Sequence, residues 1–518
     1  MAKVKIKAGG KIVILALIAT FMFVGYKFGA PYILPQGKGQ QDVSGLMAGP
    51  GASGSVSGTS AAGNGCINVG VVTWPGYAGG QYWNNGFKDN ANSKFRQDGI
   101  CVNFSVMDDF AASRAAFKSG AMDLMWVTVD AFPTESGNYG ENVKFLFQAD
   151  WSRGGDAIVT KSNIGSVVDL QGKKIAVAEG TPSHTFLLWM LDMGGLSIMD
   201  VNIVKVPSAI DAAAAFKAGQ VDAAVVWSPD DADCVKSVSA AKVLVSTKQA
   251  ANIIADGFMV KEAYYNAHKA DLKKLVEGWL RGAVEINGSD AAKQRAAQIL
   301  SEGLQNVTKE FALASLGNVR LTTLGDNKDF YGLNSSYAGV TGRSIYEKMT
   351  TVYGRLNLAS KSLPWNVVAD TSFISSLQVP GEVAAEAKPT FTAPTQRDVT
   401  AHAVASKPVK ISFAHGSVTL DENSQTIIDD KVVEQLKAFP TSRIRVEGNT
   451  DKTGSAAVNI QISRQRAQAV VDYLVQKHGF DTNRFIVVGN GPSKPACNED
   501  TPVCLARNRR TEFQILEM

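Results

Sequence analysis

The sequence predicts an α/β protein with two domains behind an N-terminal apolar helix, and three observations lead to this fold class. Residues 12–34 are almost wholly apolar and follow four lysines. From residue 66 to about residue 370, short apolar strand-like runs alternate with stretches of helical periodicity. A smaller βαβαβ unit follows over residues 409–518. A chain of 518 residues has room for about two to four domains with cores of their own.

The composition excludes several other classes of protein. With 45% hydrophobic and 19% charged residues, the chain is unlike a disordered polymer, a collagen-like repeat, a small disulfide scaffold or a protein with many membrane spans. Its net charge of 52 − 48 = +4 belongs to the N-terminus, because the first 34 residues carry five lysines and no acid. The other 518 − 34 = 484 residues therefore sum to 4 − 5 = −1.

Residues 1–35 are expected to form a transmembrane anchor or a signal. Ile12–Tyr26 alone matches the apolar part of a secretory signal. Continued past Lys27, whose side chain can snorkel, the run reaches Leu34 and has 23 residues, against the ~20 that a spanning helix needs. Small residues suited to cleavage are not evident near its end. An uncleaved anchor with its lysines in the cytoplasm is favoured, with a cleaved signal as the alternative.

Two linkers are expected between the structured parts. Residues 36–65 are rich in Gly and Ser and show no apolar periodicity, which indicates a flexible linker. Residues 371–408 are rich in Pro and Ala and indicate a second, stiffer linker. The structured domains are therefore expected over residues 66–370 and 409–518.

Five cysteines suit an oxidising compartment. Cys66 and Cys101 each begin a strand-like run, and as neighbours in a parallel βαβ unit they would lie ~4.8 Å apart, near disulfide reach. Cys497 and Cys504 close a short loop and form the more favoured bridge. Cys234 is left as a buried free thiol. No C-x-x-C pair occurs, so we expect no metal site.

The middle domain contains a strand that runs into the start of a helix. Ile175–Ala178 leads through Gly180 to Thr181-Pro182-Ser183, which suits a first helical turn. This arrangement aims free backbone N–H groups beyond the carboxyl end of the strand, where open α/β sheets bind ligands. By itself, the pattern is better explained by an ordinary capped helix.

The wider pattern resembles the periplasmic solute-binding proteins of ABC importers, and among them the nitrate, taurine and alkanesulfonate binders. The phrases that carry this resemblance are Asp-Leu-Gln-Gly-Lys-Lys-Ile-Ala-Val at 169–177 and Phe-Lys-Ala-Gly-Gln-Val-Asp-Ala at 216–223. The resemblance implies a two-lobed type II periplasmic-binding-protein fold with a solute in the cleft. The first lobe would use about 66–150 and the segment after about 255, and the second lobe about 155–250.

The resemblance places the solute on loops that follow strands. The expected solute-binding residues are Trp74, Tyr77, Thr128, Thr181, Ser183 and Trp227. The tryptophans would form apolar walls while the hydroxyls orient a polar head, although each aromatic ring would suit the core of its own lobe equally well. Arg153 would suit an anion. Asp130 and Asp230, beside aromatic rings that attract ammonium groups, would suit an amine, and the sequence leaves both open.

No catalytic or cofactor-binding motif accompanies these residues. The five histidines lack metal-ligand spacing, and the sequence holds neither a G-x-S-x-G elbow nor a phosphate-binding G-x-x-x-x-G-K-[ST] loop. We therefore expect neither an enzyme nor a cofactor.

The C-terminal unit carries the most specific motifs of the chain. A T-D-x-x-G phrase at 450–454 follows a strand, and an N-x-x-I-S-x-x-R-A phrase at 459–467 belongs to a helix. Over about 409–518 the chain strongly resembles the OmpA-like peptidoglycan-binding domain. The resemblance implies that Asp451 and Arg466 bind the ammonium and carboxylate groups of a diaminopimelate-containing peptide, supported by Thr450 and Asn459.

The charged residues of this unit allow two other interpretations. Asp451 and Arg466 would form an exposed ion pair worth under ~1 kcal/mol if they had no ligand. The basic residues Arg507, Arg509 and Arg510 lack the aromatic neighbours typical of a nucleic-acid site, and we expect no nucleic-acid partner.

Together these features predict a cell-envelope protein of a diderm bacterium. A single N-terminal helix would anchor it in the inner membrane with the N-terminus in the cytoplasm, and the rest would lie in the periplasm. There it would bind peptidoglycan and capture a small solute, for an ABC permease or for sensing. The alternative is a structural tether between membrane and cell wall, whose middle domain is a spacer or a protein-interaction module.

Overall fold

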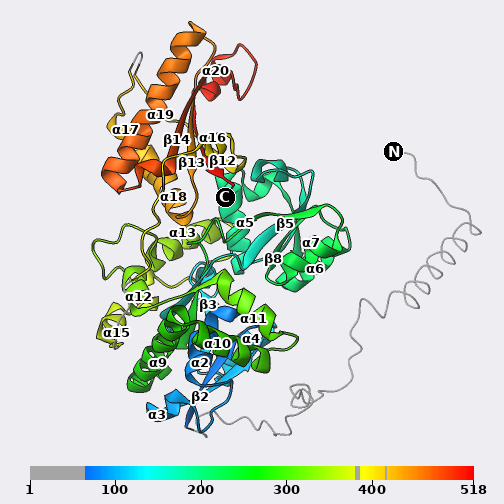
Figure 1. Cartoon of the computed structure of the whole chain (residues 1–518), viewed down its shortest axis with the longest axis vertical. Coiled ribbons are helices and arrows are strands. Elements are labelled where there is room, and N and C mark those ends of the chain that lie inside the picture. The colour runs from blue at the N-terminus through cyan, green and yellow to red at the C-terminus, as the bar shows by residue number, and fades with distance from the viewer. Residues whose placement is uncertain (1–64, 380–384, 415–416, 518) are drawn as a thin grey trace, which may run out of the picture. The chain divides into compact units, whose positions relative to one another are not determined.

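The computed structural model describes residues 65–379, 385–414 and 417–517 (Figure 1). The predicted anchor and almost all of the first linker lie outside these residues. Among the residues that are described, no helix is both long and apolar enough to cross a membrane.

The first lobe is built on a six-stranded sheet with the order β11-β4-β10-β3-β1-β2. Its strands are β1 (Cys66–Val71), β2 (Cys101–Val106), β3 (Leu124–Thr128), β4 (Val143–Ser152), β10 (Ala255–Lys261) and β11 (Val319–Leu321). β1 pairs in parallel with β2 and β3, whereas β10 runs antiparallel to β3 and β4. The core is aromatic: the fully buried Trp279 packs against Phe104, Phe147 and Phe258.

Helices from two stretches of the chain complete this lobe. The early ones are α2 (Ala78–Trp83), α3 (Lys94–Gln97) and α4 (Phe110–Ser119). The later ones are α8 (Glu262–Ala267), α9 (Lys269–Gly288), α10 (Asp290–Gly303), α11 (Lys309–Ser315), α12 (Leu324–Phe330), α13 (Gly342–Arg355), α14 (Trp365–Val368) and α15 (Thr371–Ser376). In α13, the buried Tyr353 hydroxyl lies 2.8 Å from the Thr185 hydroxyl of the second lobe.

The second lobe has a five-stranded sheet with the order β7-β6-β8-β5-β9. Its strands are β5 (Asp156–Lys161), β6 (Lys174–Ala178), β7 (Asn202–Val206), β8 (Ala223–Trp227) and β9 (Ala241–Ser246), and its helices are α5 (Pro182–Met193), α6 (Ala209–Lys217) and α7 (Asp230–Ser237) (Figure 1). α6 begins with a reciprocal cap, because Ser208 Oγ accepts from the Asp211 amide and donates to its carboxylate.

The chain passes between the lobes twice, over residues 153–155 and 247–254. The Thr247 hydroxyl joins the two crossings: it accepts from the Gly154 amide at 2.9 Å and lies 2.8 Å from the Ser152 hydroxyl. This is the two-lobed arrangement that the resemblance implies, with both crossings held by one side chain.

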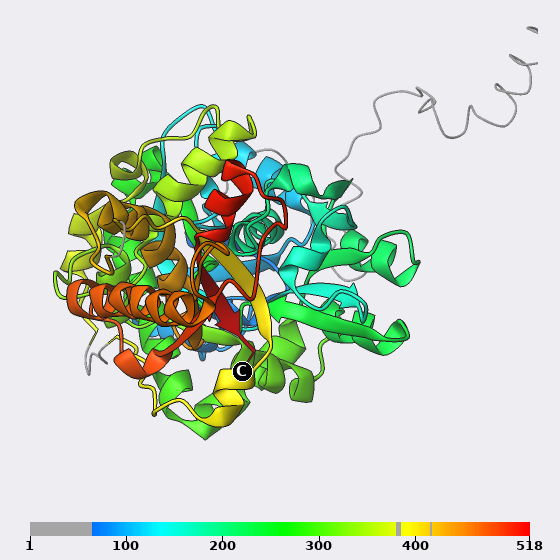
Figure 2. The same cartoon turned by 90° about the horizontal axis from the view of Figure 1, so that it is seen from above.

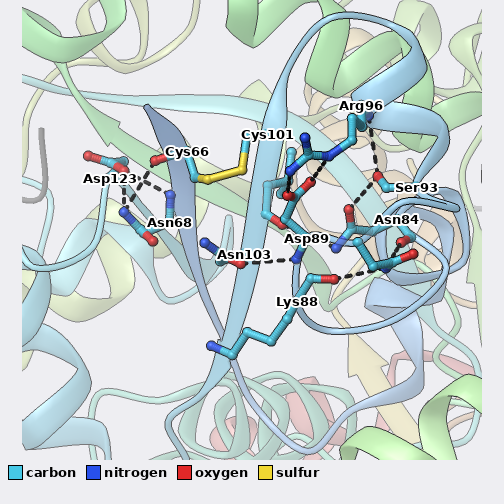
Figure 3. The surroundings of a disulfide bond; sticks show 12 residues. Cys66, Asn68, Asn84, Lys88, Asp89, Ser93, Arg96, Cys101, Asn103 and Asp123 are labelled. Atoms are coloured by element: carbon cyan, nitrogen blue, oxygen red, sulfur yellow. Dashed lines mark hydrogen bonds and ion pairs between the residues drawn. A yellow bond between two sulfur atoms is a disulfide. The ribbon is translucent and has the colours of Figure 1, made fainter. Parts of the chain in front are cut away.

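The two disulfides pair as the sequence predicts. Cys66 and Cys101 are partners in the parallel register of β1 and β2, with their Cα atoms 4.3 Å apart (Figure 3). Figure 3 also shows Asn68 next to this bridge, where its backbone N–H donates to Asp123 at 2.8 Å. Cys497 and Cys504 form the second bridge, and Cys234 is a buried free thiol.

The C-terminal region forms a separate four-stranded sheet with the order β12-β15-β13-β14. Its strands are β12 (Ala403–Val409), β13 (Ile444–Asn449), β14 (Phe485–Gly491) and β15 (Thr511–Leu516), and its helices are α16 (Gln396–Thr400), α17 (Glu422–Ile428), α18 (Glu434–Ala438), α19 (Ala456–His478) and α20 (Pro502–Asn508). The long helix α19 packs on β13 and β14 through its buried face of Ala467, Val470, Val471 and Leu474 (Figures 1 and 2).

Structured elements lie inside the stretch 371–408 that the sequence predicts to be a linker. α15 occupies its start, α16 lies within it, and β12 begins at Ala403, before the predicted domain boundary at 409. β12 pairs with β15 alone, so Pro408 sits on an edge strand, where a missing N–H is tolerated. The sheet therefore has four strands where the predicted βαβαβ unit has three.

We predict that replacing Cys66 and Cys101 together by serine lowers the free energy of unfolding of the two lobes by about 2–4 kcal/mol, because a bridge across 35 residues restricts the unfolded chain. Tryptophan fluorescence during chemical denaturation measures this, since all eight tryptophans lie between residues 74 and 365. The Cys497→Ser/Cys504→Ser variant is the control and should leave that transition in place. An unchanged transition in the first variant would contradict the prediction.

Candidate functional site

A cavity lies between the two lobes and is lined by both. Its lining residues are Val72, Trp74, Trp126, Thr128, Asp156, Pro182, Trp227, Ile254 and Asp256. Its free volume is about 20 Å³. In this conformation the cavity has room for a group of only a few heavy atoms.

Three tryptophans form the walls of the cavity. Trp126 of β3 and Trp227 of β8 meet edge to face, with ring centroids 6.4 Å apart and planes at 89°. Neither indole N–H has a hydrogen-bond partner among the described residues. The third ring, Trp74, rests on the crossing segment at Gly155, where a Cβ atom would lie 2.0 Å from the ring. Any larger residue at position 155 would therefore overlap the Trp74 ring in its present position.

Four buried aspartates surround the base of the cavity. Asp130 follows β3, Asp150 and Asp256 are paired neighbours on β4 and β10, and Asp156 begins β5. All four are at most 5% exposed. Asp150 accepts a hydrogen bond from Trp74 Nε1 at 3.1 Å, and the lack of a side chain at Gly76 leaves space for its carboxylate.

In each of the two aspartates that line the cavity, one carboxylate oxygen accepts a hydrogen bond from a neighbouring hydroxyl. Asp256 Oδ1 accepts from the Tyr77 hydroxyl at 2.7 Å, and Asp156 Oδ2 accepts from the Ser152 hydroxyl at 2.7 Å. Neither second oxygen takes a hydrogen bond from a described residue. Behind them, both oxygens of Asp130 are buried without a hydrogen-bond partner in the described part of the chain, although the Thr128 and Thr185 hydroxyls lie close enough to favour its charged form.

Burial makes these carboxyl groups hold their protons. It raises the pKa of Asp130 and of Asp156 to about 7 and that of Asp150 to about 8. The pKa of Asp256 is raised well above its ordinary value by burial and by the neighbouring Asp150. No positive charge of a described residue lowers these values; what opposes them is hydrogen bonding.

The structure brings only some of the predicted solute-binding residues to the cavity. Trp74, Thr128 and Trp227 line it, and Tyr77 contacts it through Asp256. Thr181 and Ser183 are buried beside the lining residue Pro182; the Thr181 hydroxyl donates to the Ala178 carbonyl at 2.7 Å instead of capping α5. The Ser183 hydroxyl is buried without a partner in the described chain.

None of the three charged residues that the sequence suggests for a ligand stands in the lining; Asp130 is buried behind it. Arg153 instead pairs with Glu386 at 2.6 Å, and Asp230 starts α7 outside it. Sequence reasoning missed Trp126, Asp150, Asp156 and Asp256 as site residues. The available signal was an acid within an otherwise apolar strand, as in residues 145–151 and 255–260.

We predict that Asp156→Asn stabilises the fold at pH 8 and has little effect at pH 5. A carboxyl whose folded pKa is raised binds its proton more tightly in the folded state, so stability falls as pH rises from about 4 towards 7. The substitution removes this loss, and we expect the melting temperature at pH 8 to rise by about 5 °C. The exposed Asp472→Asn serves as the control. A variant less stable than the parent at pH 8 would contradict the prediction.

The second candidate site lies in the C-terminal region, on the loop after β13. Asp451 accepts hydrogen bonds from Arg509 Nη1 at 2.6 Å and from the Thr453 amide at 2.9 Å. Although partial burial acts in the opposite direction, these bonds hold the pKa of Asp451 below its ordinary value. This carboxylate therefore stays ionised under conditions that protonate those of the cleft.

Arg466, on α19, completes this site without touching Asp451. Its Nε donates to the Ser417 carbonyl at 3.1 Å, and its guanidinium lies 4.9 Å from the Phe413 ring. Burial and the nearby charge of Arg509 lower the pKa of Arg466. Arg509 thus forms the ion pair with Asp451 that Arg466 does not form.

The two supporting residues are placed at the same loop. Asn459 Nδ2 donates to the Thr453 carbonyl at 3.0 Å and fixes the loop on α19. The Thr450 hydroxyl is buried and has no partner among the described residues. Sequence reasoning considered Arg509 only as part of a basic run, because its motif position does not reveal its contact with Asp451.

Two protein families match separate parts of the chain. The C-terminal region matches the OmpA family. This match covers residues 412–509. A second match, to the family described as NMT1/THI5 like, covers residues 97–288. The predicted fusion of a solute-binding-protein-like region with an OmpA-like region is therefore confirmed.

Several curated relatives match a stretch of about 105 residues of the chain. Peptidoglycan-binding protein ArfA of Mycobacterium tuberculosis is 37% identical over 105 residues, which are 20% of this chain and 32% of that protein. Outer membrane protein A of Bordetella avium is 36% identical over 104 residues, which are 20% of this chain and 53% of that protein. The chain thus spans about a third of the length of the curated relatives that it first matches.

Several solved structures align with part of the chain. The aliphatic sulphonate binding protein SsuA of Escherichia coli has a TM-score of 0.46 at 16% identity, covering 58% of this chain and 96% of that one. SsuA of Xanthomonas axonopodis bound to MOPS has a TM-score of 0.44 at 18% identity, covering 59% and 99%. The desulfurization enzyme DSZB has a TM-score of 0.42 at 15% identity, covering 60% and 97%.

Proposed function

We propose that the chain is a cell-envelope protein that holds a small solute in the cleft between its lobes while its OmpA region binds peptidoglycan. One observation carries the solute-binding half of this proposal: polar atoms of Thr128, Asp130 and Ser183 are buried around the cavity without a partner among the described residues. Each such atom costs about 1–3 kcal/mol. In a spacer this loss of stability would have no function, whereas a ligand that forms hydrogen bonds with these atoms would offset it.

The two-lobed construction supports the same proposal. A solute that contacts both lobes binds the closed arrangement better than an open one, and so shifts the population towards closure. Lining residues come from both sides, with Trp126 and Thr128 on the first lobe and Asp156 and Trp227 on the second. The crossings joined by Thr247 are the natural hinge for this movement.

For the OmpA region, the proposed ligand is a diaminopimelate-containing peptide of peptidoglycan. The similarity to a protein named for peptidoglycan binding supports this, and so does the geometry. Asp451 would accept from an ammonium group, while Arg466 offers the planar fork that suits a carboxylate. Arg509, already bonded to Asp451, would then share that carboxylate or turn to a ligand carboxylate.

The place of the protein in the cell is proposed on the sequence. Residues 1–35 would form a single inner-membrane span with a cytoplasmic N-terminus, and the two disulfides suit a periplasmic location for the rest. The captured solute would pass to an ABC permease or report to a partner. We propose a binder rather than an enzyme, without cofactor or nucleic-acid partner.

We predict that Asp451→Ala and Arg466→Ala each abolish co-sedimentation with purified peptidoglycan, because each removes the partner of one ligand charge. Arg464→Ala and Asp472→Ala, both exposed on α19, are matched controls of charge and should sediment with the wall like the parent. Circular dichroism checks that the variants fold. Undiminished sedimentation of both site variants would overturn the assignment of this site.

We predict that at least one small solute raises the melting temperature of the protein by several degrees and changes its tryptophan fluorescence. The screen covers anions, sulfonates, amines and amino acids. Trp227→Ala should remove the response, because Trp227 forms a wall of the cavity. If the parent is silent across the whole screen, the structural-tether alternative is favoured over a solute binder.

A further inference from the structure

The charge around the cleft is one-sided. Asp156 and Asp256 line the cavity, and Asp130 and Asp150 are buried behind them. Asp231 of α7 adds a further negative charge towards Asp156. Once ionised, these carboxylates would repel an anionic ligand in a medium of low dielectric constant, where such repulsion is strong.

The cations near the cleft are already committed. Arg114 of α4 forms a two-pronged ion pair with Glu135, with N–O distances of 2.9 and 2.8 Å. Arg153 is paired with Glu386. His184 of α5 is neutral, because burial lowers its pKa to about 4. Among the described residues, no basic side chain lines the cavity, so none is available to neutralise a bound anion.

Three acceptors that line the cavity have room for a hydrogen-bond donor, whereas the indole N–H groups of Trp126 and Trp227, unpartnered among the described residues, are free to donate. Thr128 lines the cavity, is 2% exposed, and has a hydroxyl without a partner in the described chain. Asp156 and Asp256 each present a second carboxylate oxygen that no described residue bonds. A group with several N–H bonds that diverge from one positively charged atom satisfies all three acceptors.

The walls suit the same group. Trp126 and Trp227 both line the cavity and meet edge to face, and the Arg114 guanidinium already lies over the Trp126 ring, 4.4 Å from its centroid. The faces of indole rings attract ammonium groups, and the attraction is stronger in a site without water. A bare metal ion fits less well, because no cluster of three or more His, Cys, Asp or Glu side chains with metal-binding geometry occurs in the described residues.

From this geometry we infer that the cleft takes a small primary amine in its ammonium form, with the ammonium group held by Asp156, Asp256 and Thr128 between the indole walls. The inference rests on the proposed function of the cleft as a solute site and names the chemical class of that solute. The free volume of about 20 Å³ is enough for the ammonium end of the ligand. A longer ligand fits only if the two lobes move apart.

Binding is coupled to the titration of the carboxyl groups. Burial holds protons on these aspartates near neutral pH, and an incoming ammonium group displaces them, so affinity rises with pH through about 7 to 8. Other charged or titratable groups packed around the cluster are Tyr77 of the first lobe, Asp231 of α7, Arg114 with Glu135, His184 of α5 and Tyr353 of α13. The tyrosines stay protonated in this range, because burial raises the pKa of both.

The test uses the full chain in detergent and four probes of matched size: n-butylamine and 1,4-diaminobutane as cations, butane-1-sulfonate as the anion, and 1-butanol as the neutral compound. Titration calorimetry at pH 8 should show binding of an amine and none of the sulfonate. Affinity for the amine should fall about tenfold at pH 6, with proton release visible in buffers of different ionisation enthalpy.

Variants identify the residues responsible. Asp156→Asn and Asp256→Asn keep the shape of the side chains and should weaken amine binding at least tenfold at pH 8. Asp233→Asn, exposed on α7, is the matched control and should bind like the parent. Melting curves show whether each variant folds; Trp227→Ala provides an independent wall variant if an aspartate variant does not.

The outcomes separate this inference from the function on which it rests. Failure of both amines to bind, or full amine affinity in the folded aspartate variants, overturns the amine inference. If butane-1-sulfonate or 1-butanol binds instead and Trp227→Ala abolishes that binding, the cleft is still a solute site and the proposed function stands. If no probe and no solute of the wider screen binds, the amine inference and the proposed solute-binding function are both overturned.

Discussion

The burial of four carboxyl groups where the lobes meet is the constraint on which the rest of the site depends. Removing a carboxylate from water is costly unless it is paired, bonded or protonated. The chain meets this cost with local donors, Trp74, Tyr77 and Ser152, each positioned for one carboxylate. Gly76 and Gly155 are necessary parts of this arrangement, because a Cβ atom at either would overlap Asp150 or Trp74.

On the proposed function, the same residues would connect ligand contact to movement of the lobes. Ser152 ends β4 of the first lobe and donates to Asp156, which begins β5 of the second. Its hydroxyl also meets Thr247 in the other crossing. A ligand that changes the charge of Asp156 therefore acts on a side chain whose partners lie in both crossings. Binding and closure share one hydrogen-bonded cluster, and no long pathway is needed between them.

Local signals in the sequence predicted the fold better than the site. The pairing of Cys66 with Cys101 followed from two strand starts, and the OmpA motifs located Asp451 and Arg466 before any coordinates. Asp150, Asp156 and Asp256 were missed because a single acid in an apolar strand does not reveal which strand ends will converge across two sheets. β12 was missed because Pro408 is typical of a linker, and only pairing with β15 explains it. Arg509 reaches Asp451 across 58 residues, a contact that no short motif encodes.

The two proposed sites place acids of the same type in opposite electrostatic situations. In the OmpA region, Asp451 keeps its charge because an arginine and a backbone amide bond it, so its pKa is lowered. In the cleft, burial without a cation raises the pKa values of the aspartates to about 7 and 8. Mild acidification would therefore discharge the cleft while leaving Asp451 ionised. On the proposed functions, the protein would release an ammonium ligand and remain attached to peptidoglycan, so attachment and capture are electrostatically independent within one chain.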